Sequence, residues 1–183
     1  MTNILDTPVL KPRWGEMLSL GSGIFPAPEP WTNVDIYEDY QPDIVADICD
    51  LHMIDTGSVE HVYMGHVLEH LTVEDATRAL IEARRVLTPG GGLWVVGPDA
   101  DRCDPSDFAL METIVHGGDG GNPAWGDNPH SAHRWTCTED VLQRMVSAIF
   151  PGAHSVELND LPVFVPTVAR EEAPWQCAVV AIR

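Results

Sequence analysis

The stretch Met17-Leu18-Ser19-Leu20-Gly21-Ser22-Gly23 decides how this sequence folds. Its first four residues are mostly apolar and end at a glycine, which predicts a short buried strand followed by a tight turn. Glycine adopts a positive φ without strain and lets a ligand approach the backbone closely. At the end of a strand in an α/β sheet, such a turn lies on the edge where ligands bind. Leu20, Gly21, Ser22 and Gly23 therefore form a candidate binding loop.

Strands and helices alternate along the rest of the chain. Further strands are expected at 32–37, 42–47, 59–64 and 93–96, and two more close the chain at 155–158 and 178–182. Helices are expected after the cap residue Thr72, around 108–115, and after a capping box formed by Thr136 and Glu139. This alternation predicts one α/β domain with a doubly wound, mostly parallel sheet.

The connection between the binding loop and the second strand is unusually short. It spans Ile24 to Trp31 and contains Pro26, Pro28 and Pro30. A parallel crossover normally takes about a dozen residues or more, and spaced prolines exclude a helix interior. We therefore expect the first crossover helix to be missing and one sheet face to be thinly covered. A homodimer or another partner is expected over that face.

Acidic residues stand at the ends of the second and third expected strands. Asp35 lies where nucleoside-binding α/β domains place a carboxylate that accepts hydrogen bonds from ribose hydroxyls. Asp47 occupies the equivalent position one strand later. Taken alone, each aspartate is equally well explained as a turn residue at a strand end. Together with the glycine loop, the two residues favour a nucleoside-containing ligand.

Composition narrows the class of protein. The 183 residues are 44% hydrophobic, enough for the core of one domain, and no apolar run approaches the length of a membrane span. The N-terminus lacks the order of a secretion signal, so a cytoplasmic location is expected. A net charge of −18 opposes binding to a phosphate backbone and disfavours nucleic acid as a partner. Arg78, Arg84 and Arg85 are interpreted as ion-pairing residues of a helix.

In combination, five segments resemble the small class I, Rossmann-like S-adenosylmethionine-dependent methyltransferases. The matching segments are Leu18–Gly23, Asn33–Ile36, Asp43–Ile48, His66–Leu71 and Arg84–Gly91. The resemblance extends from about Met17 to Asp99, and a weaker similarity follows at 133–150. It implies S-adenosylmethionine as cofactor and S-adenosylhomocysteine as product.

The resemblance also implies a role for each matching residue. The glycine loop would pass under the methionine part of the cofactor, Asp35 would hold the ribose hydroxyls, and Ile36 would pack on the adenine. Asp47 and Ile48 would border the adenine edge. Gly65 and His66 would line the sulfonium side. The full expected cofactor set is Leu20, Gly21, Ser22, Gly23, Asp35, Ile36, Asp47, Ile48, Gly65 and His66.

The acceptor region is expected after the fifth strand. Residues 100–135 are interpreted as a lid or acceptor-binding insertion, and residues 1–16 as an N-terminal extension of the single methyltransferase domain. Candidate catalytic residues are His66, Asp99, His130 and His133. The pair His66 and His70 has the i, i+4 spacing of some zinc sites but lacks their acidic residue after the first histidine. We therefore expect no metal, His66 in the wall of the pocket, and His70 at a helix start.

The function implied is methyl transfer to an oxygen or nitrogen atom of a small-molecule acceptor. The alternative is a catalytically silent, methyltransferase-like protein that binds cofactor or a partner. A nicotinamide dehydrogenase is disfavoured because Gly21-x-Gly23 lacks the third glycine and the following helix of the dinucleotide fingerprint.

Overall fold

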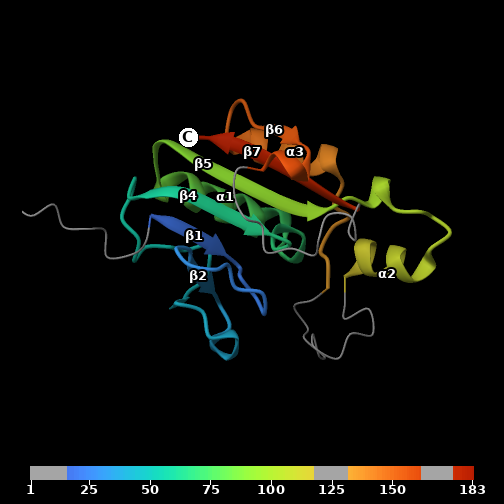
Figure 1. Ribbon diagram of the computed structural model, residues 1–183, viewed down its shortest axis with the longest axis horizontal. Helices are drawn as coiled ribbons and strands as arrows, with labels where there is room; N and C mark the ends of the chain where they lie inside the picture. The colour runs from blue at the N-terminus through green and yellow to red at the C-terminus, as the bar shows by residue number, and fades with distance from the viewer. Residues whose placement is uncertain (1–15, 118–131, 162–174) are drawn as a thin grey trace, which may run out of the picture.

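The computed structural model describes residues 16–117, 132–161 and 175–183 as one seven-stranded sheet with flanking helices (Figure 1). The strands lie in the order β3-β2-β1-β4-β5-β7-β6, and β7 runs antiparallel to the other six. Their bounds are β1 Met17–Leu20, β2 Thr32–Asp35, β3 Ile44–Val45, β4 Val59–Gly65, β5 Leu87–Pro98, β6 His154–Val156 and β7 Gln176–Ile182. The expected mostly parallel α/β fold is confirmed.

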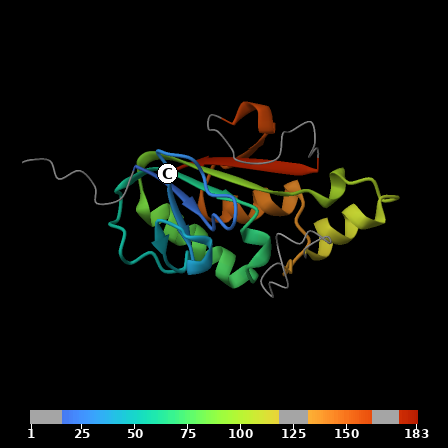
Figure 2. The same cartoon turned by 60° about the horizontal axis from the view of Figure 1, so that its bottom comes forward.

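Two helices cover one face of the sheet. Figure 2 shows α1 (Val73–Val86) and α3 (Glu139–Ile149) on the same side, while α2 (Phe108–His116) lies beyond the end of β5. The buried face of α1 consists of small and aliphatic residues at helical spacing, as the sequence predicts. These residues are Ala76, Ala79, Leu80, Ala83 and Val86. The threonine cap is also confirmed, because Thr72 accepts a hydrogen bond from the Asp75 amide.

The start of α3 differs from the sequence prediction. The helix is capped by Thr138, whose hydroxyl accepts from the Val141 amide, and Thr136 lies outside it. The reason is a tertiary contact. Cys137 is fully buried and its carbonyl accepts from the Ala100 amide, which holds the segment extended up to the new cap.

In the described part of the chain, the opposite face is covered without an α-helix, by the connection after β1 and the 3₁₀ turn η5 (Leu158–Asp160). Residues 21–31 form turns and extended backbone between β1 and β2. Ala27 and Trp31 pack there against Tyr63 and Trp94, with the Trp31 and Tyr63 rings edge to face at 6.1 Å. Asn33 fixes this connection by two hydrogen bonds to the Ala27 backbone, of 2.8 and 3.0 Å.

The strand order reverses between β1 and β4. From β1 the chain builds outward through β2 and β3, then returns to add β4 on the other side of β1. In an open α/β sheet, a crevice forms at such a switch point beyond the carboxyl ends of the strands. The fold therefore places the glycine loop, the end of β2 and the end of β4 around one opening. No helix of the described residues is long and apolar enough to cross a membrane.

Candidate functional site

A cavity of about 580 Å³ opens at this switch point. Its walls include Gly21 after β1, Asp35 at the end of β2, Gly65 at the end of β4 and Pro98 at the end of β5. Ligand pockets typically measure about 300–1,000 Å³, so the space suits a nucleoside cofactor together with a small acceptor. The structure thus gathers residues that are distant in sequence around one volume.

The glycine loop is fastened to β2 by its backbone. The amides of Gly21 and Ser22 both donate to the Val34 carbonyl, at 2.8 and 3.3 Å. Gly21 has a φ of +69°, and a Cβ at this position would collide with the side chain of Val67. Both observations explain why glycine stands here. Leu20, expected among the cofactor residues, instead belongs to the core and does not line the cavity.

Asp35 couples the loop to the end of β2. Its residue is only 6% exposed; Oδ2 accepts from the Gly23 amide at 2.8 Å, and Oδ1 accepts from the Tyr37 amide at 2.9 Å. Each carboxylate oxygen has a second lone pair, so the group retains acceptor capacity toward the cavity. A ribose with two hydroxyl donors matches that capacity.

The remaining expected cofactor residues also line the cavity. Ile36 is 55% exposed and offers an apolar surface, whereas Ile48 is buried beneath the site. Asp47 accepts from the Cys49 amide at 2.9 Å, which orders the turn after β3. An apolar side chain next to acceptor oxygens is suited to a planar base with exocyclic donors.

The end of β4 is compact and strained. A Cβ on Gly65 would overlap the Tyr63 hydroxyl, so only glycine fits. His66 follows with a φ of 51°, and its amide donates to the Val96 carbonyl at 2.8 Å. Positive φ is uncommon for a residue other than glycine, and such strain concentrates at functional sites. The His66 ring lies edge to face with Trp175 at 5.7 Å.

Of the four candidate catalytic residues, two line the cavity. They are His66 and His133. Asp99 lies outside the lining: Oδ1 accepts from the Asp101 amide at 3.2 Å, and Oδ2 pairs with Arg102 at 3.0 Å. Asp99 is 3% exposed and does not line the cavity, so a catalytic role for it stays a prediction that this geometry does not support. His130 lies outside the described residues.

Sequence reasoning missed Glu69, which is the most buried charged residue of the site. It is 1% exposed, and its Oε1 lies 3.3 Å from His66 Nδ1. Burial alone would raise the pKa of this carboxyl, but the contact with His66 and the nearby His70 and His133 hold the pKa below its usual value. The sequence signal that could have identified Glu69 is the presence of a glutamate within the apolar run after β4.

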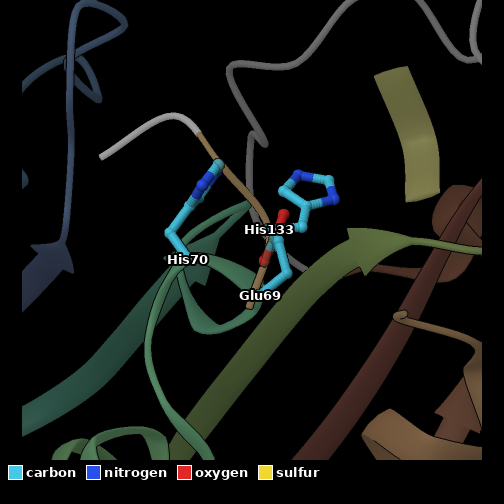
Figure 3. A group of neighbouring side chains, drawn as sticks. All are labelled: Glu69, His70 and His133. Atoms are coloured by element: carbon cyan, nitrogen blue, oxygen red, sulfur yellow. The ribbon is translucent and has the colours of Figure 1, made fainter. Parts of the chain in front are cut away.

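His70 and His133 complete the group around Glu69 (Figure 3). His70 ends the 3₁₀ turn η3 (Leu68–His70) and is not at the start of a helix as expected, because α1 begins at Val73 after the cap Thr72. The rings of His70 and His133 lie edge to face at 4.8 Å. Burial lowers the pKa of His133, while the charge of Glu69 acts in the opposite direction. The imidazole of His133 is therefore predominantly neutral at pH 7.

The cavity also recruits residues from the C-terminal strand. Trp175 and Gln176 line it because antiparallel pairing brings the start of β7 next to Pro98. The Gln176 Oε1 atom and the Tyr63 hydroxyl are buried without a hydrogen-bond partner among the described residues. Both can bind polar groups of a ligand.

Comparison with known proteins agrees with this geometry. Residues 31–95 match the family model described as a methyltransferase domain. No curated protein matches the sequence significantly.

Solved structures share the fold at low sequence identity. A SAM-dependent methyltransferase from Archaeoglobus fulgidus has a TM-score of 0.58 at 16% identity, over 91% of this chain and 85% of that one. A possible histamine N-methyltransferase from Thermotoga maritima has a TM-score of 0.58 at 17% identity, over 92% and 82%. The 1,6-didemethyltoxoflavin-N1-methyltransferase from Burkholderia thailandensis, solved with 1,6-didemethyltoxoflavin and S-adenosylhomocysteine, has a TM-score of 0.53 at 13% identity, over 91% and 70%.

Proposed function

We propose that this chain is a class I S-adenosylmethionine-dependent methyltransferase that methylates an oxygen or nitrogen atom of a small molecule. Its fold and the match of residues 31–95 to the methyltransferase-domain model support this proposal. One observation carries the proposal. The cavity at the switch point joins a glycine loop and Asp35 at one end to a polar cluster of Glu69, His70 and His133 at the other.

The first end fits the cofactor. Gly21 offers bare backbone, Asp35 offers acceptors for ribose hydroxyls, and Ile36 offers an apolar surface for adenine. Bound S-adenosylmethionine supplies an activated methyl group on a sulfonium sulfur. The protein then has to align an acceptor atom with the carbon–sulfur bond and exclude competing water.

The second end fits an acceptor. Thr113, Ile114 and Gly117, from the C-terminal end of α2, border the cavity beside His133, so part of the 100–135 segment forms its wall. This supports the interpretation of that segment as acceptor-binding. His66 and His133 carry imidazole nitrogens that can accept a proton from an acceptor hydroxyl or amine.

Calorimetry with S-adenosylmethionine and S-adenosylhomocysteine tests the proposal first. We expect both to bind, and binding of neither would overturn it. Production of S-adenosylhomocysteine is then measured with phenols, hydroxy acids and amines as acceptors. Cofactor binding without turnover on any of these classes would instead support the silent, methyltransferase-like binding protein.

A further inference from the structure

The carboxylate of Glu69 is buried in the cavity wall, and neighbouring histidines stabilise its charge. Its side chain is 2% exposed, and Oε1 has no well-directed hydrogen bond in the described structure. Among the described residues, Oε1 lies 3.3 Å from Nδ1 of His66. A buried carboxylate is costly unless it is paired or coordinates a metal ion. Oε1 of Glu69 therefore retains acceptor capacity toward a cation in the cavity.

Two histidines direct nitrogen atoms to the same place. One ligand atom from each of Glu69, His70 and His133 lies within 4.8 Å of the others. Figure 3 shows the carboxylate between the two imidazole rings. His70 Nδ1 is buried and has no partner among the described residues. The three groups come from η3 and from the segment before α3, which the fold brings together.

The tautomer of His133 is suited to metal binding. Its Nδ1 lies 2.9 Å from the Ile114 carbonyl, which can only accept, so the proton of neutral His133 is on Nδ1. The lone pair is consequently on Nε2. Metal-ligating histidines characteristically donate their second ring N–H to a carbonyl or carboxylate, which fixes the ring. Ile114 performs that role here.

We propose that Glu69, His70 and His133 bind one divalent transition-metal ion at the acceptor end of the cavity. Two imidazoles with one carboxylate favour Zn²⁺, Fe²⁺, Co²⁺ or Mn²⁺ over Mg²⁺ and Ca²⁺, which prefer oxygen ligands. Ligands about 2.0–2.2 Å from an ion lie about 3–4 Å apart, so small side-chain rotations close the site around it. Three protein ligands leave positions open toward the cavity.

The open positions define the acceptor class, a step that rests on the proposed methyl transfer. A cation there binds an acceptor with two adjacent oxygen atoms, such as a vicinal diphenol or an α-hydroxy acid, and favours ionisation of a bound hydroxyl. The hydroxyl oxygen attacks the sulfonium methyl, the carbon–sulfur bond breaks to give the thioether, and the hydroxyl proton is released to water. His133 then serves as a ligand and not as the proton acceptor.

The experiment measures metal binding and cofactor binding separately on the full chain. After dialysis against a chelator, Zn²⁺ and Mn²⁺ are titrated by calorimetry, and Co²⁺ is added to record its visible absorption. We expect one ion per chain and an affinity at least tenfold lower in Glu69→Gln, His70→Ala and His133→Ala. His154→Ala is the matched control, because His154 is exposed on β6 away from the cavity; it retains the affinity.

Thermal unfolding and S-adenosylhomocysteine titration of each variant control for misfolding. A variant that binds S-adenosylhomocysteine like the parent and has lost the metal supports the site. A parent that binds S-adenosylhomocysteine but no ion, or variants that keep the parent's metal affinity, would overturn the inference and leave the proposed function intact. Metal binding without cofactor binding would support the site and overturn the proposed function.

Discussion

Gly21 and Gly23 share a left-handed backbone but differ in their surroundings. A Cβ on Gly21 would strike Val67, whereas a Cβ on Gly23 would meet no atom within 4 Å. We expect Gly21→Ala to lower stability by more than the approximately 1–2 kcal/mol of a left-handed alanine and to weaken S-adenosylhomocysteine binding at least tenfold. Gly23→Ala should lower stability only by the cost of a left-handed alanine, because its Cβ would not collide with a neighbouring atom.

Urea unfolding and calorimetry measure these two effects. Gly152→Ala is the control for backbone strain alone, since Gly152 has a φ of +92°, open space around it and no place in the cavity. Equal losses in Gly21→Ala and Gly152→Ala would contradict the role assigned to the Val67 contact.

Asp35 should be far more sensitive than its neighbour Asp43. Asp35 accepts from Gly23 through one oxygen and from Tyr37 through the other, so the Nδ2 group of Asp35→Asn must face one of these amides. Asp43 accepts both of its hydrogen bonds, from the Asn33 backbone and side chain, through a single oxygen, which an asparagine can retain.

We expect Asp35→Asn to lose about 1–3 kcal/mol of stability and to bind S-adenosylhomocysteine about 10- to 100-fold more weakly, because hydrogen bonds to a charged group are lost. Asp43→Asn should change neither quantity appreciably. Denaturant unfolding and calorimetry of the two variants in parallel provide the test, and equal cofactor affinities would remove Asp35 from the ribose site.

At the scale of elements, Arg85 joins α1 to the turn that precedes β4. Its guanidinium forms two hydrogen bonds with Glu82 and donates to the carbonyls of Leu51 and Ile54 at 2.8 and 2.9 Å. Arg84, the adjacent residue, is exposed. We expect Arg85→Ala to cost about 2–3 kcal/mol, because buried carbonyl acceptors lose their partner.

Arg84→Ala should remain within about 0.5 kcal/mol of the parent, as surface substitutions usually do. Chemical denaturation of both variants measures the difference. A similar loss in the two would mean that the charge of the helix, and not the contacts of Arg85, determines the effect.

The pattern of apolar residues along the sequence predicted the elements whose conformation depends on residues close together in the chain. The apolar spacing of α1 and the apolar run of β1 were sufficient, because each is set by burial of neighbouring residues. The start of α3 was misplaced by two residues because Cys137 is held by Ala100, a contact that no local pattern contains. The short turn η3, which precedes the Thr72 cap, was not predicted.

For the whole molecule, the cofactor half of the site could be predicted and the acceptor half could not. Gly21, Asp35 and Gly65 follow directly from strand ends, so their proximity is implied by a parallel sheet. Glu69 and His133 are separated by more than sixty residues, and β7 delivers Trp175 through an antiparallel pairing. Only the folded arrangement shows that these side chains share one cavity.

Among the described residues, no α-helix covers the second face of the sheet, and this predicts association of two copies. Side chains alternate along a strand, so Ile182 lies on the same face as Ala178 and Val180, which pack under the connections on that side. Ile182 is 64% exposed. Stable interfaces bury roughly 800 Å² per partner, and a sheet face covered by loops offers an extended surface for this.

We therefore expect light scattering coupled to size-exclusion chromatography to give twice the chain mass of 20.1 kDa. Ile182→Glu should shift the mass toward the monomer, because a charge on that face opposes burial. Ile81→Glu is the matched control: Ile81 is 50% exposed on α1, which lies on the other side of the sheet, and its substitution should leave the mass unchanged. A monomer mass for the parent at every concentration would contradict the dimer, and equal shifts in both variants would place the interface elsewhere.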